Sequence, residues 1–184
     1  YFSDFKRGVL ERYGVDRIED LPVNFRGLVA VEGERLTSGL FDAYAERSAA
    51  IQHAQNARVA VFGALSPALP LRKLSMAAAA TDLSSHLRFL EQAEAHRYTM
   101  VQQLNQLQAD GVRYADDTAK DADADRRKRV DSARWKDIPE FAFVPEPASH
   151  LLRAMLPAAA ILLTWLLAAC ALLALATRRL GAAR

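Results

Sequence analysis

Histidine titrates near neutral pH and is the commonest metal ligand, and it occurs four times in this sequence, at His53, His86, His96 and His150. His86 and His96 lie in a segment with helical spacing, where their ten-residue separation corresponds to about 15 Å along the axis. They cannot share one metal ion within that helix. The sequence also lacks an H-E-x-x-H motif and a cysteine cluster. We therefore expect neither a metal site nor a cofactor site.

The stretch "EQAEAHRY" (91–98) places Glu94, Arg97 and Tyr98 beside His96. Such a group could be a ligand or acid–base set, or a set of surface and interhelical hydrogen-bonding residues. We favour the second interpretation, because the rest of the sequence offers no partner motif. It has no G-x-S-x-G, no glycine-rich phosphate loop and no dinucleotide fingerprint. We expect no catalytic residue and no enzyme activity. The serines at 66, 84 and 85 are interpreted as caps and turn formers.

Charge is distributed unevenly along the 184 residues. All 22 acidic residues and 20 of the 24 Lys and Arg precede position 151, so this part is close to neutral. The remainder carries four arginines and no acid. The basic excess thus belongs to the apolar end of the chain, and it is not the footprint of a nucleic-acid surface. Cys170 is the only cysteine, which excludes a disulfide within this chain.

The segment 154–176 is uncharged, and Thr164 is its one clearly polar side chain. Twenty-three helical residues exceed the ~30 Å thickness of a hydrocarbon core. A buried soluble helix of this length would normally show a polar face. We predict one transmembrane helix over residues 151–177, with Pro157 tolerated near its start. Its many alanines suit close helix packing in lipid, although alanine is common throughout the sequence.

The arginines that flank this segment indicate its orientation. Arg178, Arg179 and Arg184 lie within seven residues on the C-terminal side, whereas the N-terminal flank has Arg134, Lys136 and Arg153 spread over twenty. Density favours a cytoplasmic C-terminus. We expect residues 1–150 to form an extracytoplasmic, periplasmic domain and residues 178–184 to form a cytoplasmic tail.

The spacing of apolar residues in 1–150 predicts helices joined by short breaks. A helix over 2–13 should end at Gly14, followed by a turn and loop over 15–27. A second periodic segment runs from about 32 to 62, and "GALSPALPLRK" (63–73) interrupts it. A short helix is expected after Pro70. A long helix should follow, with Thr81 or Asp82 as its N-cap.

The long helix after position 82 shows a rhythm of alternating steps of four and three. Its predicted inward positions are Leu83, Leu87, Leu90, Glu94, Arg97, Val101, Leu104, Gln108 and Gly111. This is the pattern of two helices packed along their length, and its polar members indicate a hairpin that is partly wet or meets another chain. Residues 115–132 should form an exposed helix end or loop, or a docking segment. Residues 133–152 should be extended, with one short strand at most. The predicted fold class is mainly α: a helical bundle or long hairpin followed by one C-terminal transmembrane helix.

Three stretches resemble one family: "RYGVDRIEDLPVNFRG" (12–27), "LSPALPLRKLSMAAAATDLSSHLRFLEQAEAHRYTMVQQLN" (65–105) and "WKDIPEFAFVPEP" (135–147). They are similar to bacterial ABC-2 type transporter permeases that carry a domain of unknown function before the last span. The matching positions are Leu65, Ser66, Pro67, Leu71, Leu74, Thr81, Asp82, His86, Phe89, Ala93, Glu94 and Arg97. The family's tyrosine falls on His96 or on Tyr98, depending on the alignment.

The resemblance implies the C-terminal part of a permease subunit of the bacterial inner membrane. Such a subunit forms the membrane path with a second permease or a second copy of itself. A separate ATPase subunit powers it, through regions outside this chain. The first residue, Tyr1, and the absence of a leader pattern agree with a fragment of a longer protein. The alternative is a tail-anchored helical interaction or sensor protein of the cell envelope, and a membrane-bound enzyme is the third hypothesis.

Overall fold

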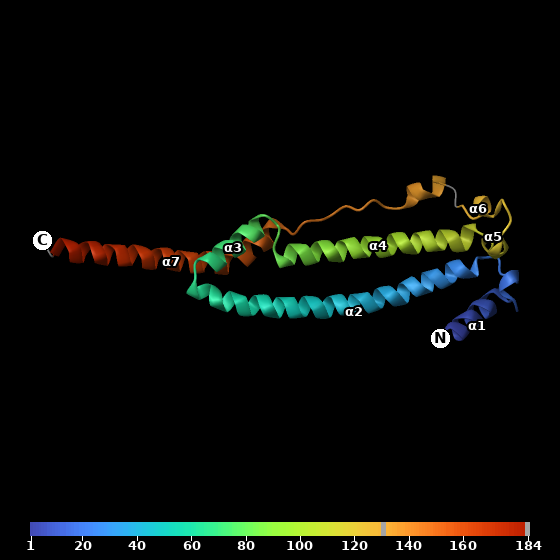
Figure 1. The fold of residues 1–184 in the computed structure, drawn as a ribbon, viewed down its shortest axis with the longest axis horizontal. Helices are drawn as coiled ribbons and strands as arrows, with labels where there is room; N and C mark the ends of the chain where they lie inside the picture. Colours follow the sequence, from blue (N-terminus) through green and yellow to red (C-terminus); the bar gives the residue numbers. More distant parts are fainter. Residues whose placement is uncertain (130–131, 183–184) are drawn as a thin grey trace. The chain divides into compact units, whose positions relative to one another are not determined.

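The computed structural model describes residues 1–129 and 132–182, and within them it contains helices and no strand. The predicted mainly α fold is confirmed (Figure 1). The elements are α1 (Phe2–Tyr13), η1 (Ile18–Asp20), α2 (Phe25–Phe62), η2 (Gly63–Leu65), α3 (Ala68–Ala78), α4 (Leu83–Gly111), α5 (Tyr114–Thr118), α6 (Ala124–Arg127), η3 (Ser132–Asp137) and α7 (Ala148–Ala182). They form two compact units. Unit 1 comprises Tyr1–Tyr44 with Ala93–Ala142, and unit 2 comprises Ala45–Gln92 with Phe143–Arg184.

Helix α1 ends where the sequence predicts, at Gly14. This residue has φ 65° and ψ 33°, the left-handed conformation that glycine adopts without steric cost, and its N–H bonds back to the last turn. The helix turns Val9 towards Leu21 and Phe25, and these three buried side chains form the small core of unit 1. α1 is therefore held in place by the start of α2.

Helix α2 begins at Phe25, seven residues earlier than predicted. Asn24 is fully buried and caps it: its side-chain oxygen accepts a hydrogen bond from the Arg26 N–H at 2.9 Å. The Asn24 N–H in turn donates to the Ala109 carbonyl at 2.7 Å. The expected loop over 15–27 was therefore wrong at its end, because Gly27 is a helical residue rather than a breaker.

Gly27 is required by a close helix crossing. A Cβ at this position would lie 2.5 Å from both the Cα and the N of Ala109 on α4. Two backbones can approach this closely only where side chains are minimal. The crossing also explains why the predicted inward register of α4 was wrong at Leu90, Leu104 and Gly111, which are exposed, whereas Ala109 is fully buried.

The N-terminus of α4 confirms one of the two expected caps. The Asp82 carboxylate accepts the Ser85 hydroxyl at 2.5 Å and the Ser85 N–H at 3.4 Å, so Asp82 is the cap. Ser66 also acts as predicted, because its hydroxyl accepts the Ala68 N–H at 3.3 Å. Helix α3, however, starts before Pro70 and not after it. Pro70 lies in the first turn, where its missing N–H costs no hydrogen bond.

In unit 2, helix α7 packs against α3 and η2 along its first part. Ala158 is buried there, and Leu151 and Met155, which share its face, are partly buried. From Leu163 to Gly181 every residue of α7 is exposed. One face of the first four turns is thus covered by protein, whereas the helix is exposed from Leu163 to Gly181.

The prediction that residues 133–152 are extended holds only for 139–147, which form no strand; it was wrong at both ends, because 133–137 lie in η3 and 148–152 are the first residues of α7. The side chain of Gln92 on α4 binds the backbone of this segment at Val144. Its oxygen accepts a hydrogen bond from the Val144 N–H at 2.8 Å, and its amide nitrogen donates to the Val144 carbonyl at 2.9 Å. The Arg88 Nε donates to the same carbonyl at 2.9 Å. These side-chain bonds replace the ladder of a neighbouring strand, which is why an extended segment needs no sheet here. The Trp135 side chain and residues 130–131 lie outside the described part.

We predict that Gly27→Ala lowers the free energy of unfolding by about 1–3 kcal/mol, because the new methyl group would push the α4 backbone away. The matched control is Gly33→Ala on the same helix, where a Cβ meets nothing within 4 Å. This control should raise stability by about 0.5–1 kcal/mol through helix propensity. Chemical denaturation followed by far-ultraviolet circular dichroism measures both. Equal effects of the two substitutions would contradict the close crossing.

Candidate functional site

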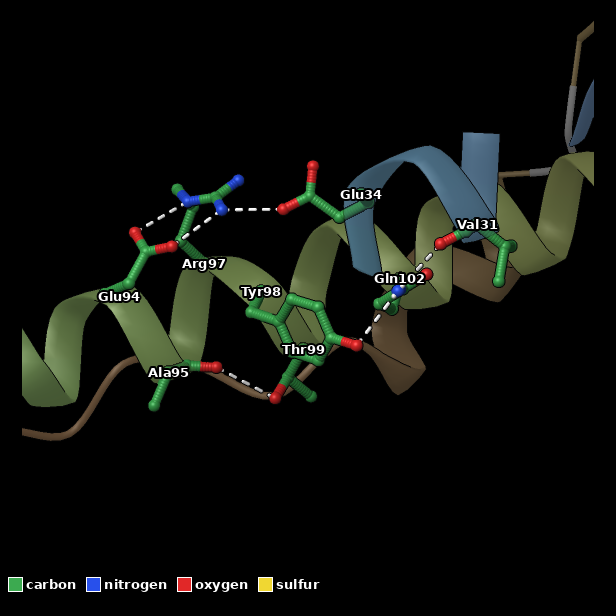
Figure 2. Close-up of polar contacts among 8 residues, drawn as sticks. All are labelled: Val31, Glu34, Glu94, Ala95, Arg97, Tyr98, Thr99 and Gln102. Carbon is green, nitrogen blue, oxygen red and sulfur yellow. Dashed lines mark hydrogen bonds and ion pairs between the residues drawn. The ribbon is translucent and has the colours of Figure 1, made fainter. Parts of the chain in front are cut away.

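A seam of polar side chains joins α2 and α4 in unit 1 (Figure 2). We call Glu34, Glu94, Arg97, Tyr98 and Gln102 the polar seam. Arg97 is its centre: Nη2 lies 2.6 Å from Glu34 Oε1 on α2 and 2.7 Å from Glu94 Oε1 on α4. Its Nε donates to Glu94 Oε2 at 2.7 Å. One guanidinium thus bridges two carboxylates on two helices.

The charges in the polar seam stabilise one another. Hydrogen bonding from Arg97 holds the pKa of Glu94 below its usual range. The bonds to Glu94 and Glu34 raise the pKa of Arg97, so the guanidinium stays charged. A carboxylate with a lowered pKa is a poor proton acceptor at neutral pH. The arrangement is suited to holding two helices in register and not to proton transfer.

Gln102 extends the polar seam with neutral contacts. Its Nε2 donates to the Val31 carbonyl on α2 at 3.0 Å and to the Tyr98 hydroxyl oxygen at 3.1 Å. Thr99 lies next to them in sequence but bonds back to the Ala95 carbonyl of its own helix at 2.9 Å (Figure 2). The favoured interpretation of "EQAEAHRY" as interhelical hydrogen-bonding residues is therefore confirmed for Arg97. The sequence pattern did not identify Glu34 on α2, the partner of Arg97.

The four histidines are separated. The His96 ring lies against Phe141, with ring centroids 5.4 Å apart. His150 Nδ1 lies 3.5 Å from Glu146 Oε1, and His53 is exposed on α2. Among residues 1–129 and 132–182, no group of three or more His, Cys, Asp and Glu side chains is placed to hold a metal ion.

His86 borders an open hollow of about 450 Å³ in unit 2. Its wall is formed by Ala80, Thr81, Ser85, His86, Arg88, Phe89, Phe143, Pro145, Glu146 and Leu151. The Ser85 hydroxyl, the obvious nucleophile, is already engaged as a donor to the capping carboxylate of Asp82. Arg88 is engaged with the Val144 carbonyl. Both side chains thus make structural contacts, Ser85 with the cap of α4 and Arg88 with the extended segment.

The alanine-rich charged segment contains two short helices in its described part, 115–129 and 132. Arg127 pairs with Asp116 at 2.9 Å and with Asp121 at 2.5 Å. Arg127 of the basic half thus pairs with two aspartates of the acidic half of the same segment. This agrees with the favoured interpretation, an exposed helix end, while the docking alternative stays a prediction.

These features define a class of protein: a helical hairpin protein that has, among residues 1–129 and 132–182, one helix long and apolar enough to cross a membrane. The polar contacts described above hold helices together or cap them. The chain belongs to the family described as "Domain of unknown function (DUF3526)", whose profile matches residues 1–144. No curated protein and no solved structure matches the chain.

We predict that a double-mutant cycle between Arg97→Met and Glu34→Gln gives a coupling free energy of about 0.5–1 kcal/mol, because the pair joins two helices and Glu34 is largely shielded from water. The matched control is the Glu32–Arg35 pair, which is local to α2 and should contribute at most about 0.5 kcal/mol. Denaturant unfolding of the single and double variants measures both. A coupling between Arg97 and Glu34 within error of zero would contradict the bridging role.

Stability should also fall on acidification. Hydrogen bonds from Arg35 and from Tyr1 lower the pKa of Glu32 to about 2. A carboxyl whose folded pKa lies below its unfolded pKa stabilises the protein above the unfolded value, and this contribution is lost as the pH falls towards the folded pKa. For Glu32 the window runs from about pH 4.5 down to about 2.

We therefore expect Glu32→Gln and Arg35→Gln each to flatten the loss of stability between about pH 5 and pH 2.5. Glu32→Gln should have the larger effect, because in Arg35→Gln the Tyr1 hydroxyl still donates a hydrogen bond to Glu32. Unfolding by denaturant at a series of pH values measures the slopes. Slopes identical to that of the parent protein in both variants would show that this pair does not contribute.

Proposed function

We propose that this chain is the C-terminal part of an ABC-2 type transporter permease, which forms a membrane path with a partner permease and is powered by a separate ATPase subunit. The observation that carries the proposal is the bareness of α7. The most apolar 18-residue window of Ala148–Gly181 has a mean hydropathy of 2.5, and 6% of that window is buried. Exposed apolar surface of this extent is unfavourable in water and is satisfied by lipid or by neighbouring spanning helices.

The resemblance to ABC-2 permeases supports the step from a membrane helix to a permease. Several residues of the family motif have a structural role in this fold. Asp82 caps α4, Pro67 precedes α3, and Arg97 joins the two helices of the hairpin. The motif is therefore a pattern of residues that stabilise this helical domain. Family membership over residues 1–144 supports the same domain as a recurring unit.

In the proposed assembly, α7 lies among further spanning helices of the same subunit and of its partner, a second permease or a second copy. Its alanine-rich surface permits backbones to approach closely. Residues 1–150 lie on the periplasmic side of the inner membrane, and the tail from 178 lies in the cytoplasm. Arg184 and Ala183 of that tail lie outside the described residues. The ATPase subunit binds elsewhere on the permease.

Orientation is tested by single cysteines in the full-length protein, after Cys170 and any cysteine outside this sequence are replaced by alanine. Lys120→Cys and Leu180→Cys report the two sides of α7, and both positions are exposed. A membrane-impermeant maleimide should label position 120 in spheroplasts and position 180 only after permeabilisation. Labelling of both positions from one side would show that α7 does not cross. The reverse pattern would overturn the proposed orientation.

The permease hypothesis is tested by purifying the tagged full-length protein from bacterial membranes in mild detergent. An ABC ATPase subunit should copurify in stoichiometric amount, and the complex should hydrolyse ATP. Deletion of the gene that encodes the copurifying ATPase is the control. A protein that crosses the membrane once and purifies without an ATPase would favour the tail-anchored alternative and would overturn the proposal.

A further inference from the structure

The turn between α2 and α3 exposes an uncharged apolar surface. We call residues 59–71, "VAVFGALSPALPL", the elbow. Five of its large side chains are between 51% and 74% exposed: Val59, Val61, Phe62, Leu65 and Leu71. Isolated exposed apolar residues are ordinary on a protein surface, but a consecutive group on one turn indicates a surface that is covered in use.

The elbow is folded tightly, and it lies at α7. Its central turn η2 packs against α3, and a Cβ on Gly63 would lie 3.8 Å from the Pro70 ring and 3.9 Å from the Leu69 Cβ. Its central turn, η2, and the helix that follows, α3, both pack against α7. All of these elements belong to unit 2.

The position of this contact along α7 indicates how deep the elbow lies relative to the apolar segment. Ala158, the buried residue of α7, lies four residues inside the uncharged run that begins at Ala154. At a rise of 1.5 Å per residue this is about 6 Å below the start of the apolar segment. Interfacial helices bury their apolar faces about 5–10 Å deep at the boundary of headgroups and acyl chains. The elbow therefore lies at the depth at which apolar side chains meet lipid.

Charge around the elbow fits an anionic lipid surface. No acidic residue occurs from position 47 to position 81, whereas Arg58, Arg72 and Lys73 flank the elbow and are exposed. Helix α3 has two faces: Pro70 and Ala77 are buried, whereas Leu71, Arg72 and Lys73 point outward. Apolar residues with flanking cations and no acid are the pattern of segments that lie in the interface of a membrane.

We propose that the elbow inserts into the headgroup layer of the same bilayer that α7 crosses, with Arg58, Arg72 and Lys73 against lipid phosphates. This inference rests on the proposed spanning role of α7. The extracytoplasmic domain is then fixed to the membrane at two points, the spanning helix and the elbow beside it. Such a pair of contacts restricts the tilt of the domain relative to the membrane.

The test places an environment-sensitive fluorophore at single cysteines in the full-length protein, reconstituted in vesicles of phosphatidylcholine and phosphatidylglycerol. Cys170 and any other cysteine are first replaced by alanine. Leu65→Cys reports the elbow, and Ala50→Cys is the matched control, since it is exposed on the same helix that leads to the elbow. Leu167→Cys, on the bare part of α7, reports whether the helix crosses.

We expect the label at position 65 to be quenched several-fold more strongly by a nitroxide at a shallow lipid carbon than the label at position 50, and to resist aqueous iodide. Replacing Arg72 and Lys73 together by glutamine, or omitting phosphatidylglycerol, should weaken this quenching. A label at 167 in lipid with a label at 65 open to iodide would overturn the elbow alone. A label at 65 shielded from both quenchers would mean that protein covers it, which also overturns the proposal. A label at 167 in water would overturn the spanning helix and the elbow with it.

Discussion

The rest of this structure depends on one constraint: the second half of α7 has no polar face and is exposed. From Leu163 to Ala176 the residues of α7 are uncharged, mostly leucine and alanine, and exposed. Each exposed large apolar side chain costs about 1.5–3 kcal/mol relative to burial, and a run of them cannot be left in water. The preceding turns of α7 are different, because α3 and η2 cover one face of them. We propose that the change from a covered to an exposed surface within this helix marks the boundary between the folded domain and the membrane.

The hairpin of unit 1 is held by a different balance of forces. Its large apolar side chains are few in the core, and the helices meet at Gly27 and Ala109, where backbone approaches backbone. Such a contact gains dispersion energy from close packing rather than from the burial of bulky groups. Directional bonds then fix the register: the buried Asn24 ties the start of α2 to the end of α4, and Arg97 joins Glu34 to Glu94 further along. The hairpin is consequently specified more by polar contacts than by apolar burial.

The sequence predicted the elements better than their contacts. Local signals sufficed for α1 with Gly14, for a cap at Thr81 or Asp82 and for α7, because each depends on neighbouring residues or on length and polarity alone. Gly27 was read as the end of a loop, since a glycine needed for a close crossing has the same local signal as a glycine that breaks a helix. The leucine-based register of α4 failed at Leu90 and Leu104 for the same reason, because a crossing between small residues decides which face turns inward.

The polar seam shows a similar limit. Glu94, Arg97 and Tyr98 could be singled out because they lie together in the sequence, but Glu34 lies 63 residues away from Arg97 and has no local signal. A weak clue was available: charged residues at the inward positions of a heptad-like pattern require a partner on the facing helix. The sequence does not show which glutamate of α2 is this partner. The choice depends on the register of the two helices, which the crossing at Gly27 sets.

The central claim is that α7 lies in a membrane among other spanning helices and that the helical domain stands outside it. The most direct measurement is a structure of the full-length protein, purified with its partner subunits and reconstituted in a lipid nanodisc. The account predicts that residues 154–176 lie within the disc, in contact with further spanning helices, and that the hairpin lies beyond one face of the disc. A structure with α7 outside the lipid, folded against the hairpin or against another soluble protein, would contradict it.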